Sequence, residues 1–319
     1  MVMAQSLFIT LKKEHPHSEI DVVAPAWSVP LIKRMPEIHQ AVELPVGHKQ
    51  LGLFSRYKIG KTLRARHYDQ AIVTPRSFKS ALIPFFAKAK KRTGYRGEMR
   101  YGLLNDIRVL DKTILKQTVQ RYVALGMSPG STLSSEVPFP KLDIDSENQK
   151  QLVKKLQLKT ENPIVGFMPG AEYGPAKQWP VAYFNQLASL LNKQNVDVWV
   201  FGSEKEVASG EAIASGNDNV TNLCGKTSLT DVVDLLALTR DTVTNDSGLM
   251  HIACATGRRV VAIYGSSDPK YTPPLSDNAT IAYKGLDCSP CFKRSCPYGH
   301  ADCLNNIKPG DILNQLESS

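Results

Sequence analysis

Hydrophobic and polar positions alternate along the chain between short apolar runs and longer stretches with helical periodicity. In the first half, the predicted strands are residues 19–24, 41–44, 70–74 and 92–96, and the predicted helices are 2–14, 27–34, 52–66, 78–88 and 117–125. In the second half, the predicted strands are 163–168, 196–202, 219–223 and 259–264, and the predicted helices are 179–192, 207–214 and 228–238. Such alternation is typical of parallel sheets covered by helices.

Residues 126–141 have the composition of a linker, with a Ser-Pro-Gly sequence, a Ser-Ser pair and two further prolines. A chain of 319 residues is long enough for two domains. We therefore predict an α/β protein with two doubly wound, Rossmann-like domains, residues 1–140 and 141–319, and a cleft between them. The polar helix predicted at 146–158 is expected to bridge the two halves.

Composition favours a globular protein, because 42% of the residues are hydrophobic and 22% are charged. No apolar run approaches the roughly 20 residues that a membrane span requires. The first residues lack the layout of a secretory signal, so we expect a cytoplasmic protein. Six cysteines in a chain of this length do not indicate a disulfide scaffold.

Charge is unevenly divided between the two halves. Residues 1–125 contain 22 Lys and Arg against 9 Asp and Glu, a balance of +13, whereas the remainder has 17 against 21, a balance of −4. This asymmetry indicates that the first half meets a polyanion, such as nucleic acid, an acidic membrane surface or a phosphorylated acceptor. Solvated surface charge is the alternative for many of these residues.

Residues 241–257 have the pattern of a strand, a tight loop and a short helix that ends at Gly257. Asp246 or Ser247 is expected to cap the helix, and Gly248 lets a ligand approach the backbone. Free N–H groups and the helix dipole favour an anion such as phosphate there. His251 lies one turn into the helix, on the same face. The alternative is a capped helix with a packed histidine.

Two further loops also follow predicted strands, at the edge where open parallel sheets bind ligands. Residues 169–177 end in Lys177, whose positive charge suits a pyrophosphate leaving group. Residues 202–204 end in Glu204, a carboxylate able to accept hydrogen bonds from a ribose diol; the alternative is a surface glutamate at a helix start. The chain contains neither a P-loop nor a Gly-x-Gly-x-x-Gly pattern, which argues against ATPases and dehydrogenases.

Together, segments 166–180, 245–251 and 288–303 resemble the bacterial ADP-heptose:lipopolysaccharide heptosyltransferases, most closely the heptosyltransferase II branch. Segments 24–27, 91–97 and 101–106 extend the resemblance over almost the whole chain. The resemblance implies a GT-B glycosyltransferase whose second domain holds ADP-heptose and whose first domain holds the lipopolysaccharide inner core. The implied reaction inverts the anomeric centre and uses no metal or other cofactor.

Site residues follow from the resemblance position by position. It implies that Lys177 contacts the diphosphate and stabilises the leaving group, and that Glu204 contacts the nucleoside. The remaining donor-binding residues that it implies are Asp246, Ser247, Gly248, Leu249 and His251. The first half contains basic residues suited to the carboxylates and phosphates of the acceptor, among them Arg92, Arg96 and Arg100.

Four cysteines near the C-terminus have the spacing Cys288-x2-Cys291-x4-Cys296-x6-Cys303, with His300 nearby. They supply enough ligands for zinc, but they lack a second Cys-x2-Cys pair. The two interpretations are a structural zinc site and reduced thiols that pack a loop near the cleft, and we favour the reduced thiols.

Alternative functions stay open at this point. One is heptosyltransferase I or a related core transferase, and another is a protein that binds an ADP-sugar without catalysis. Nucleic-acid binding would explain the charge, but no helix-turn-helix, RNA-binding or zinc-finger pattern occurs, so we expect no nucleic-acid partner. The location that we expect is cytoplasmic, with peripheral attachment to the inner face of the inner membrane as an addition.

The start of the chain departs from the family pattern. Relatives begin with a strand and a Gly-Asp loop, and that Asp resembles the general base that activates the acceptor hydroxyl. Here the helical pattern begins at Val2, so we expect that the chain starts inside its first unit and lacks this base. Weak or no transfer by the chain as given is therefore predicted. Adding an upstream strand with a Gly-Asp loop tests this, and no gain in activity would contradict it.

Overall fold

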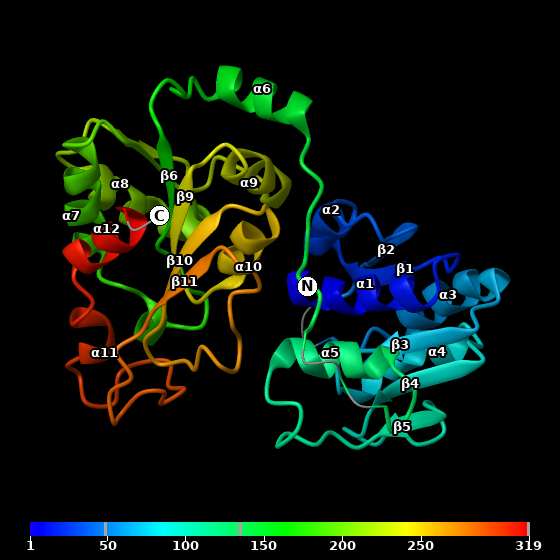
Figure 1. The fold of residues 1–319 in the computed structure, drawn as a ribbon. Coiled ribbons are helices and arrows are strands. Elements are labelled where there is room, and N and C mark those ends of the chain that lie inside the picture. The colour runs from blue at the N-terminus through cyan, green and yellow to red at the C-terminus, as the bar shows by residue number, and fades with distance from the viewer. Residues whose placement is uncertain (48–49, 132, 134–135, 318–319) are drawn as a thin grey trace. The chain divides into compact units, whose positions relative to one another are not determined.

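A computed structural model describes residues 1–47, 50–131, 133 and 136–317 (Figure 1). The chain divides into two compact units, Met3–Pro138 and Phe139–Ser319, which we call the N-terminal and C-terminal units. Within the described ranges, no helix combines the length and the apolar character needed to cross a bilayer.

The N-terminal unit alternates short strands with helices, as its sequence pattern predicts. Its strands are β1 (Asp21–Pro25), β2 (Gln40–Leu44), β3 (Gln70–Val73), β4 (Lys91–Tyr95) and β5 (Asp106–Arg108). Its α-helices are α1 (Gln5–Glu14), α2 (Val29–Ile32), α3 (Leu53–Leu63), α4 (Leu82–Phe86) and α5 (Thr118–Gly126). Short 3-10 turns are at Val2–Ala4, Ala26–Ser28, Arg64–Arg66 and Phe78–Ala81.

All strand pairs of the N-terminal unit are parallel, but they form two separate sheets, β1-β2 and β3-β4-β5. The sequence did not predict β5, because this three-residue strand carries Asp106 and Arg108 in place of an apolar run. α3 and α4 pack against β1 and β2 through Leu63, Ile83 and Ala87. α1 packs on α5, and α5 contacts β4.

The C-terminal unit contains one six-stranded sheet in which every pair is parallel, in the order β11-β10-β9-β6-β7-β8. Its strands are β6 (Ile164–Met168), β7 (Asp197–Val200), β8 (Val220–Asn222), β9 (Asp241–Asn245), β10 (Arg259–Ile263) and β11 (Ala279–Ala282). Its α-helices are α6 (Ser146–Lys155), α7 (Val181–Asn192), α8 (Val207–Ala214), α9 (Leu229–Leu236), α10 (Gly248–Ala255), α11 (Asp302–Asn305) and α12 (Pro309–Glu317). Short 3-10 turns are at Pro175–Lys177 and Glu204–Glu206.

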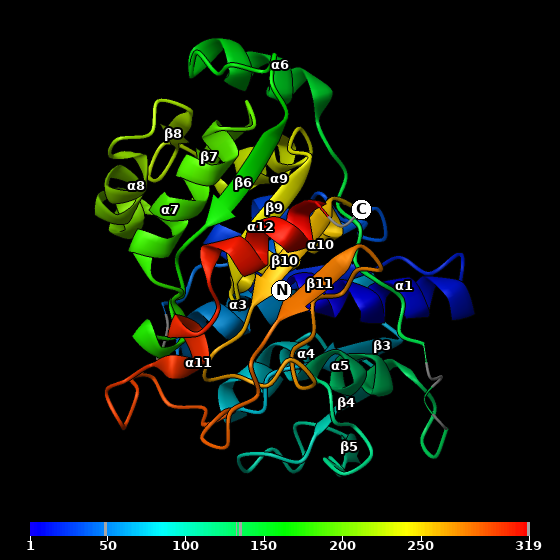
Figure 2. The same ribbon diagram turned by 60° about the vertical axis from the view of Figure 1, so that its left-hand side comes forward.

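Helices cover both faces of the C-terminal sheet, which confirms the α/β parallel architecture predicted for this half. α7, α8 and α12 lie on one face, and α9 and α10 lie on the other (Figures 1 and 2). The core under α7 is aromatic: the ring of Phe184 lies 5.3 Å from that of Phe167 and 4.8 Å from that of Trp179. Sequence analysis did not predict β11, α11 or α12.

Helix α6 belongs to the C-terminal unit and packs on α9. The amide nitrogen of Asn148 donates to carboxylates of Asp231 and Asp234 at 3.0 and 2.7 Å. Bridging of the two halves by this helix stays a prediction. Its polar residues bond to a neighbouring helix of the same unit.

Glycine at position 60 allows α3 and α4 to approach each other. A Cβ atom on Gly60 would lie 2.5 Å from the Cβ of Phe86 and 2.9 Å from the carbonyl oxygen of Ile83. We predict that Gly60→Ala lowers the stability of the N-terminal unit by about 2 kcal/mol, because overpacking outweighs the gain in helix propensity. Urea unfolding followed by circular dichroism, with hydrogen exchange of α3 and α4 peptides, measures the effect.

The matched control is Gly310→Ala in α12, where a Cβ would meet no atom within 4 Å. That variant is expected to be as stable as the parent or slightly more stable. If Gly60→Ala unfolds at the same urea concentration as the parent chain, the contact between α3 and α4 is not close-packed.

Candidate functional site

The carboxyl ends of β7, β6, β9 and β10 lie along one edge of the C-terminal sheet, because these neighbouring strands are all parallel. The three loops that the sequence predicts as ligand-binding follow β6, β7 and β9. Ligands of open parallel sheets bind at this edge. The topology therefore brings the predicted loops to adjacent positions.

Asn245, the last residue of β9, joins two of these loops through its buried side chain. Its amide nitrogen donates to the carbonyl oxygen of Pro169 at 2.6 Å, directly after β6. Its amide oxygen accepts from the backbone N–H of Trp179 at 3.0 Å, just before α7. The segment between these two contacts includes Lys177, so Asn245 fixes where that lysine is presented.

Lys177 and Asp246 form an ion pair at this edge. Their side chains are only 18% and 5% exposed, so the pair is largely removed from water. The two residues are 69 positions apart in sequence, and the fold brings them together. The Asp246 carboxylate thus holds the ammonium group of Lys177 in place at this edge.

The loop that carries Lys177 is supported by the cysteine-containing segment. The ammonium group of Lys177 lies 5.2 Å from the centroid of the Tyr173 ring, and the guanidinium group of Arg294 lies 5.6 Å from the same centroid. Arg294 also donates to the carbonyl oxygen of Tyr173 at 2.7 Å. Gly174 adopts a φ of +149°, and a Cβ there would lie 2.5 Å from the Arg294 carbonyl oxygen. The two segments therefore fit closely around a glycine.

The N-terminus of α10 is not capped by a side chain, which corrects the expectation that Asp246 or Ser247 caps it. Ser247 occupies the N-cap position without a side-chain hydrogen bond, and Asp246 is committed to Lys177. A Cβ on Gly248 would meet no atom within 4 Å, so the space beside it is open. An uncapped helix start with open space beside it suits an anionic ligand.

His251 lies in the first turn of α10 with a buried imidazole. Burial lowers the pKa of His251 to about 4, the charge of Lys177 lowers it further, and Asp246 opposes the shift. The imidazole is therefore neutral at physiological pH. Its Nδ1 atom has no hydrogen-bond partner among the described residues. It offers an unused polar group to a ligand.

Ser266 and Ser267 follow β10 and were not predicted as site residues. They are 1% and 3% exposed, and within the described ranges neither hydroxyl oxygen has a partner. The hydroxyl oxygen of Ser247, after the neighbouring strand, is in the same state. Buried hydroxyls without partners are costly, so these serines are candidates for ligand contact. Their position after a strand next to β9 is the signal that the sequence offered.

Glu204 and Leu249 are placed as their positions in the predicted loops require. Glu204 starts the 3-10 turn after β7 and is exposed, while the neighbouring capping box is made by Ser203 and Glu206. Its carboxylate is thus not used as a cap. Leu249 is half-buried in the first turn of α10. Both stay predictions as donor contacts.

The three acceptor-binding arginines do not gather in one place. Arg100 is 2% exposed and its guanidinium donates to the carbonyl oxygens of Pro75 and Tyr95, which contradicts a role in binding an acceptor. Burial lowers the pKa of Arg100 from its ordinary value. Arg92 lies at the amino end of β4 and Arg96 just past its carboxyl end. Only Arg96 is exposed at the edge where parallel strands bind ligands.

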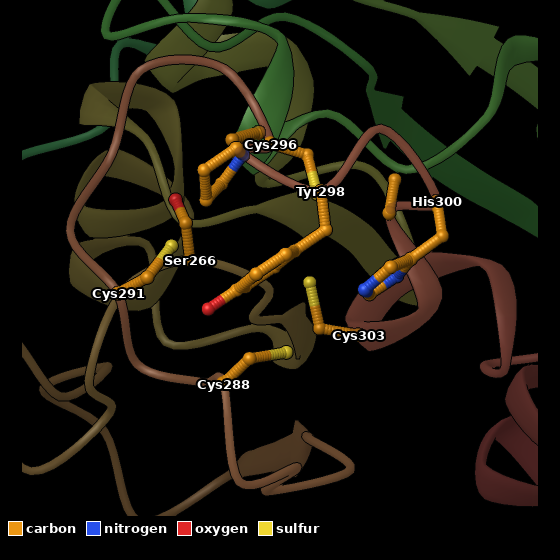
Figure 3. A pocket seen from close by; sticks show the side chains of 10 residues that line it. Ser266, Cys288, Cys291, Cys296, Tyr298, His300 and Cys303 are labelled. Carbon is orange, nitrogen blue, oxygen red and sulfur yellow. The ribbon is translucent and has the colours of Figure 1, made fainter.

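The four clustered cysteines line one small cavity of about 20 Å³, together with Ser266, Tyr298 and His300. Figure 3 shows the ring of Tyr298 reaching in among the thiols. Nowhere in the described part of the chain do three His, Cys, Asp or Glu side chains lie in an arrangement that could hold a metal ion. Zinc at Cys288, Cys291, Cys296 and Cys303 is therefore not supported by the geometry.

The thiols of this cavity differ in their ionisation. Backbone N–H groups of Ala301 and Tyr298 lower the pKa of Cys296. Burial raises the pKa of Cys303, and its three cysteine neighbours raise it further. The cysteine segment is packed against the loop of Lys177, since the backbone N–H of Ala176 donates to the carbonyl oxygen of Arg294 at 3.0 Å.

Several known proteins are similar to this chain in sequence and in fold. The model of glycosyltransferase family 9 (heptosyltransferase) matches residues 56–302. Lipopolysaccharide heptosyltransferase 2 of Salmonella typhimurium strain LT2 is 44% identical over 100% of this chain and 94% of that protein. Lipooligosaccharide heptosyltransferase 2 of Haemophilus influenzae is 47% identical over 88% of this chain and 84% of that protein. The solved structure of E. coli ADP-heptose lps heptosyltransferase II is 41% identical with a TM-score of 0.87, covering 100% and 94% of the two chains.

The depressed pKa of His251 predicts how stability depends on pH. Because the folded-state pKa of about 4 lies below the ordinary 6.5, the unfolded chain binds the proton more readily. The contribution of the neutral His251 to the free energy of unfolding is complete above about pH 6.5. It falls by roughly 3 kcal/mol as the pH drops to about 4. Urea unfolding followed by the fluorescence of Trp179 and Trp199, both buried in the C-terminal unit, measures it.

A His251→Gln variant lacks this titration. Its stability deficit relative to the parent should therefore shrink as the pH falls from 7 toward 4. As the control, Asn192→Gln exchanges one exposed amide for another at the end of α7, and its stability relative to the parent should be the same at every pH. A pH-independent difference between the parent and His251→Gln would contradict a neutral buried imidazole.

Proposed function

Because the chain belongs to glycosyltransferase family 9, the heptosyltransferase family, we propose that it moves L-glycero-D-manno-heptose from ADP-heptose to a heptose of the lipopolysaccharide inner core. The family is the one predicted from the sequence. The observation that carries the substrate assignment is the full-length similarity to lipopolysaccharide heptosyltransferase 2. The solved structure of a similar ADP-heptose lps heptosyltransferase II supports the same donor and acceptor.

In this proposal, the donor diphosphate binds at the N-terminus of α10. The uncapped N–H groups face the open space beside Gly248, and Lys177 is held next to them by Asp246. Arrival of the diphosphate gives Lys177 a second anionic partner. Ser247, His251 and the exposed carboxylate of Glu204 are the remaining polar contacts for the phosphates, the sugar and the nucleoside. The C-terminal unit is thus the donor-binding unit.

The proposed chemistry is a direct displacement that inverts the anomeric centre. The acceptor hydroxyl oxygen bonds to heptose C1, the bond from C1 to the diphosphate oxygen breaks, and the hydroxyl proton passes to a general base. Negative charge grows on the departing ADP. Lys177 and the start of α10 stabilise that charge without a metal ion. Among the described residues we assign no general base.

We propose that the N-terminal unit binds the acceptor and that the protein works in the cytoplasm at the inner face of the inner membrane. Arg96, exposed past the end of β4, supports an anionic acceptor. The positive balance of residues 1–125 supports the same placement. The buried Arg100 and the distant Arg92 take no part in it.

Incubating the purified chain, extended at its start by a strand and a Gly-Asp loop, with ADP-heptose and two inner-core acceptors, one with a single heptose and one with none, tests the proposal. Mass spectrometry should find one added heptose only on the acceptor that already carries one. Lys177→Gln should lower kcat by roughly 10²- to 10³-fold, because a charge that stabilises the leaving group is lost. The matched control, Lys193→Gln, removes an exposed lysine at the end of α7 and should leave kcat unchanged.

Other results would indicate a different function for this chain. Transfer only to the heptose-free acceptor would indicate a heptosyltransferase I activity. Calorimetric binding of ADP-heptose without turnover, also after an upstream Gly-Asp strand is added, would indicate an ADP-sugar-binding protein. Equal kcat values for Lys177→Gln and the parent would exclude Lys177 from leaving-group stabilisation.

A further inference from the structure

One face of the N-terminal unit combines exposed aromatic side chains with lysines. We call it the α3–α4 face and define it by Phe54, Tyr57, Lys58, Lys61, Phe85 and Lys88. Figures 1 and 2 show α3 beside α4, and the two helices pack together. None of these side chains has a role in the donor site, which lies in the other unit.

The apolar part of this face is continuous. Phe54 and Tyr57 are three residues apart on α3 and therefore lie on the same side of the helix. The ring of Tyr57 lies 5.2 Å from that of Phe86, which lies 5.6 Å from that of Phe85. Phe54 is 79% exposed, and Tyr57 and Phe85 are 41% exposed. A contiguous exposed aromatic patch is characteristic of an interaction surface.

Positive charge surrounds the aromatic patch. Residues 45–97 contain thirteen Lys and Arg and a single acidic residue, Asp69, which accounts for +12 of the +13 balance of residues 1–125. In the part of the chain that the structure describes, Lys58, Lys61 and Lys88 have no carboxylate partner. A cavity of about 350 Å³ adjoins Phe85 and Phe86 and is also lined by Lys88. Its other cationic residues have partners: Arg64 and Arg92 donate to backbone carbonyl oxygens, and Lys90 pairs with Asp69.

We propose that the α3–α4 face docks on a bilayer that contains anionic phospholipid. Aromatic rings favour the level of the lipid headgroups, and each lysine near an anionic surface adds attraction. Lys88, at the wall of the cavity beside Phe85, is the side chain placed to meet a lipid phosphate there. The exposed aromatic and aliphatic residues on a helix favour a lipid surface over a nucleic acid, which binds through a cationic groove with stacking rings.

The inference deepens the proposed function, since it says how the chain reaches a lipid-linked acceptor. Its test, however, does not depend on heptose transfer. A protein that docks in this way needs no membrane-spanning helix. Docking through residues on an exposed face also leaves the folded core untouched when those residues are changed.

The test is co-sedimentation of the full chain with vesicles of phosphatidylglycerol and phosphatidylethanolamine, and with vesicles of phosphatidylcholine alone. The parent chain should bind the anionic vesicles and bind phosphatidylcholine only weakly. The double substitution Lys58→Gln and Lys61→Gln should weaken binding about thirtyfold, because the attraction of two lysines to the anionic surface is lost. Phe54→Ser should weaken it about tenfold, because less apolar surface is buried in the bilayer.

Matched controls remove the same groups elsewhere in the same unit. Lys112→Gln with Lys116→Gln removes two exposed lysines, and Ile114→Ser removes an apolar side chain that is 70% exposed. Binding within about twofold of the parent is expected for both controls, because surface charge acts only within a Debye length. Equal losses in the controls and in the α3–α4 variants would overturn the proposal. So would retained binding by the α3–α4 variants, or binding to single-stranded DNA that displaces the vesicles.

Transfer to a deacylated acceptor in solution separates the two proposals. The α3–α4 variants should transfer heptose at the parent rate there, which also shows that they are folded. If the parent chain binds anionic vesicles but transfers no heptose, the docking proposal is supported and the proposed function is contradicted. If the chain transfers heptose but does not bind anionic vesicles, only the docking proposal is contradicted.

Discussion

The side-chain amide of Asn245 is the contact on which the candidate site depends. It satisfies a carbonyl group after β6 and an N–H group before α7, and all three groups are buried. Leaving such backbone groups unpaired costs about 1–3 kcal/mol each, so the loop between them is held firmly. Lys177 stands in that loop and Asp246 follows Asn245 directly. One amide at a strand end thus sets the position of both charged partners.

The ion pair between Lys177 and Asp246 explains why a charged site persists in a largely buried place. Separating two such charges from water is expensive, and each would be destabilising alone. In the proposed complex, a phosphate beside Lys177 adds negative charge, and the uncapped N–H groups of α10 are available to it. Tyr173 and Arg294 restrict the lysine from the other side. The site is therefore organised before a ligand binds.

Sequence reasoning placed three loops at one edge of the C-terminal sheet because parallel strands have their carboxyl ends at the same edge. It succeeded where one local pattern decides the outcome, as in the 241–257 segment. It failed where the partner is distant: nothing near Asp246 indicates that it pairs with Lys177 and leaves α10 uncapped. Ser266 and Ser267 were missed for a related reason. Their significance comes from burial without partners, which only the packed structure reveals.

The division of the N-terminal sheet was equally hidden, because apolar runs predict strands but not which strands pair. The structure separates β1-β2 from β3-β4-β5. Arginine side chains connect the loops and helix ends around these sheets by donating to backbone carbonyl oxygens there; they are Arg56, Arg64, Arg76, Arg92, Arg100, Arg108 and Arg121.

Arginine and lysine therefore divide the positive charge of the N-terminal unit between two tasks. The planar guanidinium presents several donors in fixed directions and stays charged when partly buried, which suits it to carbonyl groups inside a fold. The ammonium of lysine is compact and strongly hydrated, and Lys58, Lys61 and Lys88 keep it at the surface. A charge count treats both alike, which is why it overstated the arginines as acceptor ligands. The charge left for a polyanion is mainly that of the lysines, and on α3 and α4 these lie next to exposed aromatic rings.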